Sequence, residues 1–150
     1  MAVSARTQKE MSELLDAFLV GQARPGLAVG HGSAAAPVFV YAGMGWQWAG
    51  MLRDLLRSEP LVRARLERCD RLLRPLVGWS LIDLLTSAGA ETWNRAAISV
   101  PGLCAVQIAL TDLWRSWGIE PAAVIGHSCG EIAAAWAARV SSSIAFQSAM

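Results

Sequence analysis

Two short apolar segments frame the middle of the chain. Residues 38–42 (VFVYA) are apolar on both faces, which predicts a parallel strand covered by helices on each side. Residues 122–126 (AAVIG) predict a second short, buried strand, and residues 130–140 (GEIAAAWAARV) return to helical composition. Between the strands, apolar residues at helical spacing predict helices over residues 51–57, 61–73, 80–85 and 101–117. This order of strand, helices, strand, tight turn and helix predicts an α/β fold with a parallel sheet.

The first part of the chain has a different pattern. Residues 4–20 carry apolar residues at helical spacing and predict a helix that ends at Gly21. Residues 21–37 (GQARPGLAVGHGSAAAP) are rich in Gly, Ala and Pro, which predicts an extended linker. We therefore expect a folded domain to begin near Pro37.

Composition narrows the classes of function. The chain has 150 residues with 54% hydrophobic content, which suits one domain with a packed core. Its 13 basic and 12 acidic residues nearly cancel, so nucleic acid is not an expected partner. The apolar runs are interrupted well short of the ~20 residues that a membrane span needs, and the N-terminal segment does not resemble an export signal. We therefore expect a cytoplasmic protein that contacts small molecules or other protein surfaces, and no membrane.

The cysteines do not form a recognisable site. Cys69, Cys104 and Cys129 are widely spaced and include no CxxC pair. Such spacing supports neither a disulfide framework nor a zinc site, so we expect no bound metal.

The segment VIGHSCGE carries the strongest candidate chemistry. Gly126, Ser128 and Gly130 form the pattern GxSxG between a predicted strand and a predicted helix, as in a nucleophile elbow that exposes its serine hydroxyl. At the amino end of that helix, the backbone N–H of Cys129 would face an oxyanion formed at Ser128. The alternative is an ordinary turn in which Ser128 caps the helix. We expect His127 to be a neighbouring pocket residue rather than the general base.

Two further stretches carry a family resemblance together with this turn. FVYAGMGWQWAGM, VQIALTDLWRSWGIEPAAVIGHS and GHSCGEIAAA resemble the malonyl-CoA:acyl carrier protein transacylase family, and most closely the acyltransferase domains of type I polyketide synthases. The resemblance covers residues 37 to about 138. It implies the parallel-sheet, α/β-hydrolase-like large subdomain of an acyltransferase, so residues 37–150 would form a partial acyltransferase domain. Residues 1–36 resemble the linker that joins ketosynthase to acyltransferase in those synthases.

The resemblance implies a transfer in two covalent half-reactions. Ser128 would take the acyl group from an acyl-CoA and pass it to the phosphopantetheine thiol of an acyl carrier protein, in polyketide or fatty acid biosynthesis and with no bound cofactor. The backbone N–H groups of Met44 and Cys129 would bind the oxyanion. Gln47 and His127 would contact the substrate. Malonyl-CoA is the expected donor because it is the commonest extender in the family, although these residues do not select among acyl-CoAs.

A base for Ser128 is not apparent in the chain. Besides His127 there is only His31, which lies in the predicted linker and is expected to be solvated. In the family, the catalytic histidine lies far downstream of the serine, and the arginine that pairs with the malonyl carboxylate lies shortly past position 150. From Arg139 on, RVSSSIAFQSAM replaces the family's continuation, as a frameshift, a truncation or a chosen chain end would produce. We therefore expect an incomplete sheet, no ferredoxin-like small subdomain and impaired activity.

Three hypotheses for function stay open at this point. The first is an acyltransferase whose remaining catalytic residues are lost or supplied by another polypeptide. The second is a non-catalytic remnant or docking fragment of a synthase. The third and weakest is a serine esterase of the α/β-hydrolase type. Such an esterase shares the GxSxG motif, but the GMGWQW loop is not expected in it.

Overall fold

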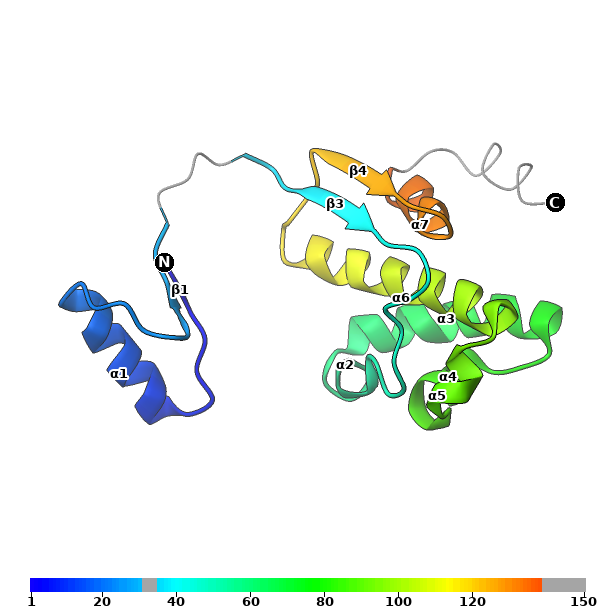
Figure 1. The fold of residues 1–150 in the computed structure, drawn as a ribbon, viewed down its shortest axis with the longest axis horizontal. Helices are drawn as coiled ribbons and strands as arrows, with labels where there is room; N and C mark the ends of the chain where they lie inside the picture. Colours follow the sequence, from blue (N-terminus) through cyan, green and yellow to red (C-terminus); the bar gives the residue numbers. More distant parts are fainter. Residues whose placement is uncertain (31–34, 139–150) are drawn as a thin grey trace. The chain divides into compact units, whose positions relative to one another are not determined.

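The computed structural model describes residues 1–30 and 35–138. The chain divides into two compact units, Met1–Ala35 and Ala36–Met150. Figure 1 shows the elements that each unit contains.

The first unit contains a helix between two short strands, namely β1 (Ala2–Val3), α1 (Gln8–Leu19) and β2 (Leu27–Ala28). α1 begins later than predicted because the Thr7 hydroxyl caps it, accepting a hydrogen bond from the N–H of Glu10 at 3.1 Å. β1 and β2 pair antiparallel, so the prediction of an extended linker is wrong where β2 forms. Gly26 makes this pairing possible, since it has φ of 86° and a Cβ there would lie 2.6 Å from the carbonyl oxygen of Ser4. Strands of two residues are too short to produce a periodic pattern of apolar and polar residues in the sequence.

The second unit contains both predicted strands and the helices between and after them. Its elements are β3 (Val38–Tyr41), α2 (Arg53–Ser58), α3 (Pro60–Val77), α4 (Leu81–Ser87), α5 (Ala90–Trp93), α6 (Ala96–Ser116), β4 (Ala123–Gly126) and α7 (Gly130–Ala137). β3 and β4 pair in parallel (Figure 1). The predicted α/β fold with a parallel sheet is therefore confirmed.

The start of α6 differs from the prediction. α6 begins at Ala96, whereas the sequence pattern placed the start at Pro101. The carbonyl oxygen of Arg95 sets the start, because it accepts hydrogen bonds at 2.9 Å from the N–H groups of Ile98 and Ser99. Pro101 removes a single N–H near the beginning of a long helix, and the helix continues through it.

Two other helix boundaries also depend on local backbone conformation, and one short helix was missed. α3 continues past the predicted end at Leu73 and past Pro75, and it stops at Gly78, which has φ of 76°. α2 starts only at Arg53 because Leu52 adopts the left-handed conformation, with φ of 64°. α5 was not predicted, since a helix of four residues shows no apolar period.

The parallel sheet is covered on one face only. β3 and β4 pair with Val38 opposite Ala123, and the described residues add no third strand to them. The side chains of Phe39 and Tyr41 pack against α7 and α6, as the sequence pattern requires for a buried face. The other face is exposed, with Val38 49% and Val40 70% accessible, so the prediction of a strand buried on both faces is wrong.

The main apolar core lies among the helices. α6 packs against α3, α5 and α7, and α3 packs against α2 and α4. The side chains at the centre of this core are fully buried, namely Val62, Leu66, Leu81, Leu85 and Leu103. A smaller apolar cluster joins the sheet to α7. Its buried residues are Tyr41, Ala133, Ala134 and Ala137. Most of the apolar burial therefore comes from helix packing rather than from the sheet.

α6 is the central helix of the second unit. By length and composition it is apolar enough to cross a membrane, with a mean hydropathy of 1.6 over its most apolar window, and no other described helix is. However, 56% of that window is buried inside the fold, which is typical of a core helix. Buried polar residues also interrupt its surface, at Ser99, Gln107 and Thr111.

Two leucines of α3 provide a matched test of the core. Leu66 has no exposed surface and Leu72 is 66% exposed. Leu66→Ala leaves a cavity and should lower the free energy of unfolding by about 2–5 kcal/mol. Leu72→Ala should change it by less than about 0.5 kcal/mol, since its surface already contacts water. Urea denaturation followed by circular dichroism measures both, and similar losses in the two variants would contradict this core.

The buried thiol of Cys104 predicts a pH dependence of stability. Burial, and to a lesser degree the thiols of Cys69 and Cys129, raises the pKa of Cys104 from 9.0 to about 11. The folded chain therefore holds this proton more tightly than the unfolded chain does. The free energy of unfolding should be at its full value below pH 9.0 and should fall as the pH rises toward about 11.

Cys104→Ala should remove part of this alkaline fall. Burial also raises the pKa of Cys69 and of Tyr41, so these groups should retain the rest of it. Urea denaturation at several pH values between neutrality and the alkaline limit measures the slope. An identical slope in the parent chain and in Cys104→Ala would disprove the assignment.

Candidate active site

A sharp turn joins β4 to α7. β4 ends at Gly126 and α7 begins at Gly130. Ser128, in the middle of the turn, has φ of 55°, a left-handed conformation that is strained for a residue with a side chain. Hydrogen bonds of 3.0 Å close the turn, from Gly130 N–H to the His127 carbonyl oxygen and from Glu131 N–H to the Ser128 carbonyl oxygen. The predicted strand, tight turn and helix are therefore all present.

Both glycines of the GxSxG pattern occupy positions with no room for a side chain. A Cβ at Gly126 would lie 2.5 Å from the Cα of Glu131. A Cβ at Gly130 would lie 2.2 Å from the carbonyl oxygen of Tyr41, at the end of β3. The first glycine lets α7 start directly beside β4, and the second lets α7 lie against β3.

The loop after β3 lies directly against this turn. A Cβ at Gly43 would lie 3.0 Å from the Cβ of Ser128 and 3.2 Å from Nδ1 of His127. Ser128 and His127 are both exposed. The fold thus brings together the two segments that the sequence analysis singled out, with the serine side chain facing the glycine loop.

Side-chain amides hold the loop in place. Gln107 Nε2 donates a hydrogen bond of 2.7 Å to the carbonyl oxygen of Ala42. Gln47 Oε1 accepts one of 2.7 Å from the N–H of Gly45, and Gln47 Nε2 donates one of 3.2 Å to the carbonyl oxygen of Trp93. Both polar atoms of Gln47 are therefore engaged in shaping the loop.

The two backbone N–H groups expected to bind an oxyanion are unpaired among the described residues. Neither Met44 N–H nor Cys129 N–H donates a hydrogen bond to another described residue. The side chain of Met44 is directed to α6, where its sulfur accepts a hydrogen bond of 3.2 Å from the Ser99 hydroxyl. Its main chain remains available to a ligand.

The alternative in which Ser128 caps the helix is wrong. The N-cap residue of α7 is Cys129, and no side chain makes a capping hydrogen bond there. The Ser128 hydroxyl has no hydrogen-bond partner among the described residues. This side chain is therefore free to react or to bind.

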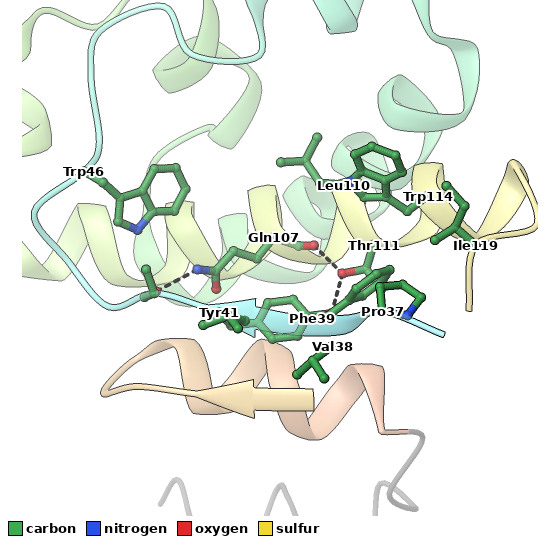
Figure 2. Close-up of a pocket in the computed structure, with 12 residues that line it drawn as sticks. Pro37, Val38, Phe39, Tyr41, Trp46, Gln107, Leu110, Thr111, Trp114 and Ile119 are labelled. Atoms are coloured by element: carbon green, nitrogen blue, oxygen red, sulfur yellow. Dashed lines mark hydrogen bonds between the residues drawn. The ribbon is translucent and has the colours of Figure 1, made fainter. Parts of the chain in front are cut away.

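Several residues that position the site were not identified from the sequence. The hydroxyl groups of Tyr41 and Thr111 are 2.8 Å apart, and Thr111 Oγ1 donates a hydrogen bond of 2.7 Å to the carbonyl oxygen of Gln107 (Figure 2). Burial raises the pKa of Tyr41, so this hydroxyl stays protonated. A usable signal existed, because Gln107 and Thr111 are polar residues one turn apart in a mostly apolar helix.

His31 and the residues from Arg139 on lie outside the described residues. Among the residues that are described, no group of three or more His, Cys, Asp or Glu side chains could hold a metal ion.

The fold and the site define a class of protein, an α/β chain with an exposed serine on a strained turn that faces a glycine loop. The family model of the acyl transferase domain matches residues 38–148. Because this match includes most of the chain, the chain belongs to the acyl transferase domain family. The match continues past Ala138, so the prediction that the resemblance stops there is wrong.

Curated relatives place the chain among polyketide synthases. It is 42% identical over 135 residues to the spectinabilin polyketide synthase system protein NorA' of Streptomyces orinoci, covering 89% of the chain and 4% of the relative. It is 49% identical over 106 residues to the erythronolide synthase EryA3 of Saccharopolyspora erythraea, covering 71% of the chain and 3% of the relative. The chain thus spans only a few per cent of the length of these relatives.

Solved acyltransferase domains share the fold. The domain from the second module of the salinomycin polyketide synthase matches with a TM-score of 0.84 and 33% identity, over 94% of the chain and 34% of that domain. The domain from module 8 of the same synthase matches with a TM-score of 0.80 and 42% identity, over 93% of the chain and 34% of that domain. A malonyl-transacylase solved with its type II polyketide acyl-carrier protein matches with a TM-score of 0.62 and 30% identity. The match covers 69% of the chain and 33% of that structure. The chain is therefore an acyltransferase-domain sequence of the polyketide-synthase type.

Gly130→Ala tests the contact between α7 and β3. The added methyl group would collide with the carbonyl oxygen of Tyr41, so the variant should unfold or should lose at least about 3 kcal/mol of stability. Gly89→Ala is the control, since a Cβ at Gly89 meets no atom within 4 Å and its expected loss is about 1 kcal/mol or less. Thermal unfolding followed by circular dichroism separates the two. A stable Gly130→Ala variant would show that the turn lies elsewhere.

Proposed function

We propose that this chain carries the nucleophile of an acyltransferase site in polyketide biosynthesis. The observation that carries the proposal is the exposed Ser128 side chain, held at φ of 55° against the Gly43 loop in a member of the acyl transferase domain family. Ser128 Oγ attacks the thioester carbonyl of an acyl-CoA and gives its proton to a base. A C–O bond forms, the C–S bond breaks, and CoA leaves as its thiol after taking up that proton. The phosphopantetheine thiol of an acyl carrier protein then attacks the ester and restores the serine hydroxyl.

Two main-chain N–H groups supply the proposed oxyanion hole. Each half-reaction passes through a tetrahedral intermediate with negative charge on the former carbonyl oxygen. The N–H groups of Met44 and Cys129 are unpaired among the described residues and lie on the two segments that flank Ser128. The amino end of α7 adds the positive end of its dipole at the same place.

The proposed donor is malonyl-CoA, and the proposed acceptor is an acyl carrier protein. The malonyl-transacylase solved with its acyl-carrier protein supports both by similarity. His127 lies beside Ser128 and against Gly43, where it would line the acyl pocket. Gln47 would act on the substrate mainly by shaping the loop, because its amide groups are already engaged. No resident cofactor takes part in this proposal, since phosphopantetheine arrives on the carrier protein.

The proposed base lies outside the described residues. No described side chain hydrogen-bonds to the Ser128 hydroxyl, and proton removal is needed for attack. We therefore expect slow acylation by residues 1–150 alone. In this proposal the second unit is part of the α/β-hydrolase-like large subdomain of an acyltransferase. The first unit is a ketosynthase–acyltransferase linker, and the protein is cytoplasmic.

Acylation of Ser128 tests the proposal directly. After incubation with malonyl-CoA, intact-mass and peptide mass spectrometry should detect one malonyl group on Ser128, because an ester without a positioned base hydrolyses slowly. Ser128→Ala should lose the adduct, and Ser87→Ala should keep it, since the Ser87 hydroxyl only bonds its own helix at the Asp83 carbonyl oxygen. Parallel incubations with methylmalonyl-CoA and acetyl-CoA compare the donors.

The outcomes separate the competing functions. No adduct from any of the three acyl-CoAs would favour a non-catalytic remnant or docking fragment. Rapid hydrolysis of simple esters, with no transfer to a carrier protein, would favour an esterase. An adduct that survives in Ser128→Ala would remove this serine from the site.

A further inference from the structure

Gln107 joins α6 to the start of the loop that carries Met44. Its Nε2 donates a hydrogen bond of 2.7 Å to the carbonyl oxygen of Ala42 (Figure 2). Gly43, which lies against Ser128, follows Ala42 directly, and Met44 comes next. Because a peptide group is planar, holding the Ala42 carbonyl also fixes the orientation of the Gly43 N–H. Gln107 therefore fixes the peptide group just before the one that contains the Met44 N–H.

The loop does not hold the Met44 N–H in place by its own backbone preferences. Glycines flank Met44 on both sides, and Gly45 has φ of 122°, so local steric constraints on the neighbouring peptide groups are weak. Contacts from outside the loop must supply the constraint. After Met44 this contact is Gln47, which accepts from the N–H of Gly45, and before Met44 it is Gln107.

α6 provides a rigid base for Gln107. The side chain of Gln107 is only 7% exposed, and its neighbour Val106 belongs to the main apolar core. The carbonyl oxygen of Gln107 accepts a hydrogen bond of 2.7 Å from Thr111 Oγ1, and the Thr111 hydroxyl lies 2.8 Å from that of Tyr41. Adjacent turns of α6 thus hold two successive residues at the end of β3, Tyr41 and Ala42.

The second polar atom of Gln107 indicates that stability alone does not explain this residue. Gln107 Oε1 is buried and has no hydrogen-bond partner among the described residues. An unpaired buried oxygen lowers stability, and leucine would fill a similar space without one. The amide cannot turn over to pair this oxygen with Ala42, because two carbonyl oxygens would then face each other. What glutamine adds here is the hydrogen bond from Nε2 to the loop.

We propose that Gln107 is a positioning residue for acyl transfer. Through the Ala42 carbonyl, it holds the Met44 N–H toward the oxyanion that forms when Ser128 attacks the thioester. Gln107 transfers no proton and acts only through the main chain of the loop. This inference rests on the proposed function of Ser128.

The rate of Ser128 acylation tests this role. Gln107→Leu removes the donor and should slow malonylation of Ser128 by about tenfold or more at saturating malonyl-CoA. The half-saturating concentration should change little, because an oxyanion donor acts mainly on the tetrahedral intermediate. Gln107→Asn keeps an amide that is one methylene too short to reach Ala42, so it should be equally slow. Time-resolved intact-mass spectrometry measures these rates, and circular dichroism checks that each variant is folded.

Gln8→Leu is the control for these variants. Gln8 is exposed on α1 in the first unit, and the same substitution there should leave the rate of acylation unchanged.

Gln107→Glu adds a pH-dependent rescue. An ionised carboxylate has no proton to donate to Ala42, whereas a protonated carboxyl group has one. Tyr41 is the one titratable residue that lines the cavity beside Gln107, no charged residue lines it, and burial raises the pKa of Tyr41. Relative to the parent chain at each pH, acylation of Gln107→Glu should therefore recover between about pH 7 and pH 5, and that of Gln107→Leu should not.

Nuclear magnetic resonance gives a readout that does not depend on acylation. The carbonyl carbon resonance of Ala42 and the amide resonance of Met44 should both move in Gln107→Leu, because the hydrogen bond to Ala42 is lost. Gln107→Glu should bring both resonances back toward their parent positions at low pH.

The outcomes distinguish this inference from the proposed function. Parent-like acylation in Gln107→Leu and Gln107→Asn would overturn it, and so would unchanged Ala42 and Met44 resonances in Gln107→Leu. If the parent chain forms no adduct, the proposed function fails and the role in transfer fails with it. Displaced resonances would in that case still show that Gln107 holds the loop.

Discussion

The site depends on a close backbone contact between the start of α7 and the end of β3. The Cα of Gly130 approaches the carbonyl oxygen of Tyr41 so closely that a Cβ would lie 2.2 Å away. This approach brings the turn after β4 and the loop after β3 to the same place, with Ser128 against Gly43. The left-handed conformation of Ser128 is costly in isolation, and the surrounding contacts keep it.

α6 acts both as core and as scaffold for the site. Its buried apolar residues, such as Leu103, Val106 and Ala109, stabilise the helical part of the unit. Its buried polar side chains are directed to β3 and to the loop, where Thr111 meets Tyr41, Gln107 holds Ala42 and Ser99 meets Met44 (Figure 2 shows the first two). Hydrogen bonds are strong in such a dry environment, and a lost partner is costly. The segment that carries the proposed oxyanion donor is thus fixed by side chains of the central helix.

The apolar burial is distributed unevenly over the second unit. The helices α2 to α6 share a continuous core, whereas the sheet is joined to α7 by a small cluster of one tyrosine and alanines. Two short strands with one covered face bury little surface by themselves. The helical part therefore buries most of the apolar surface of this unit, and the sheet contributes little to it.

Features encoded by neighbouring residues were predictable from the sequence. The positions of β3 and β4, the turn at GxSxG and the body of α3 follow from short apolar runs, glycine spacing and helical period. Features that need distant partners were not predictable. β1 and β2 exist only through their mutual pairing. The exposure of Val40 depends on which face of the sheet the helices cover, and the role of Gln107 in holding the loop depends on the packing of α6 beside Ala42. Local backbone preference and periodicity act over a few residues, but the approach of Gly43 to Ser128 is decided by packing between segments far apart in the chain.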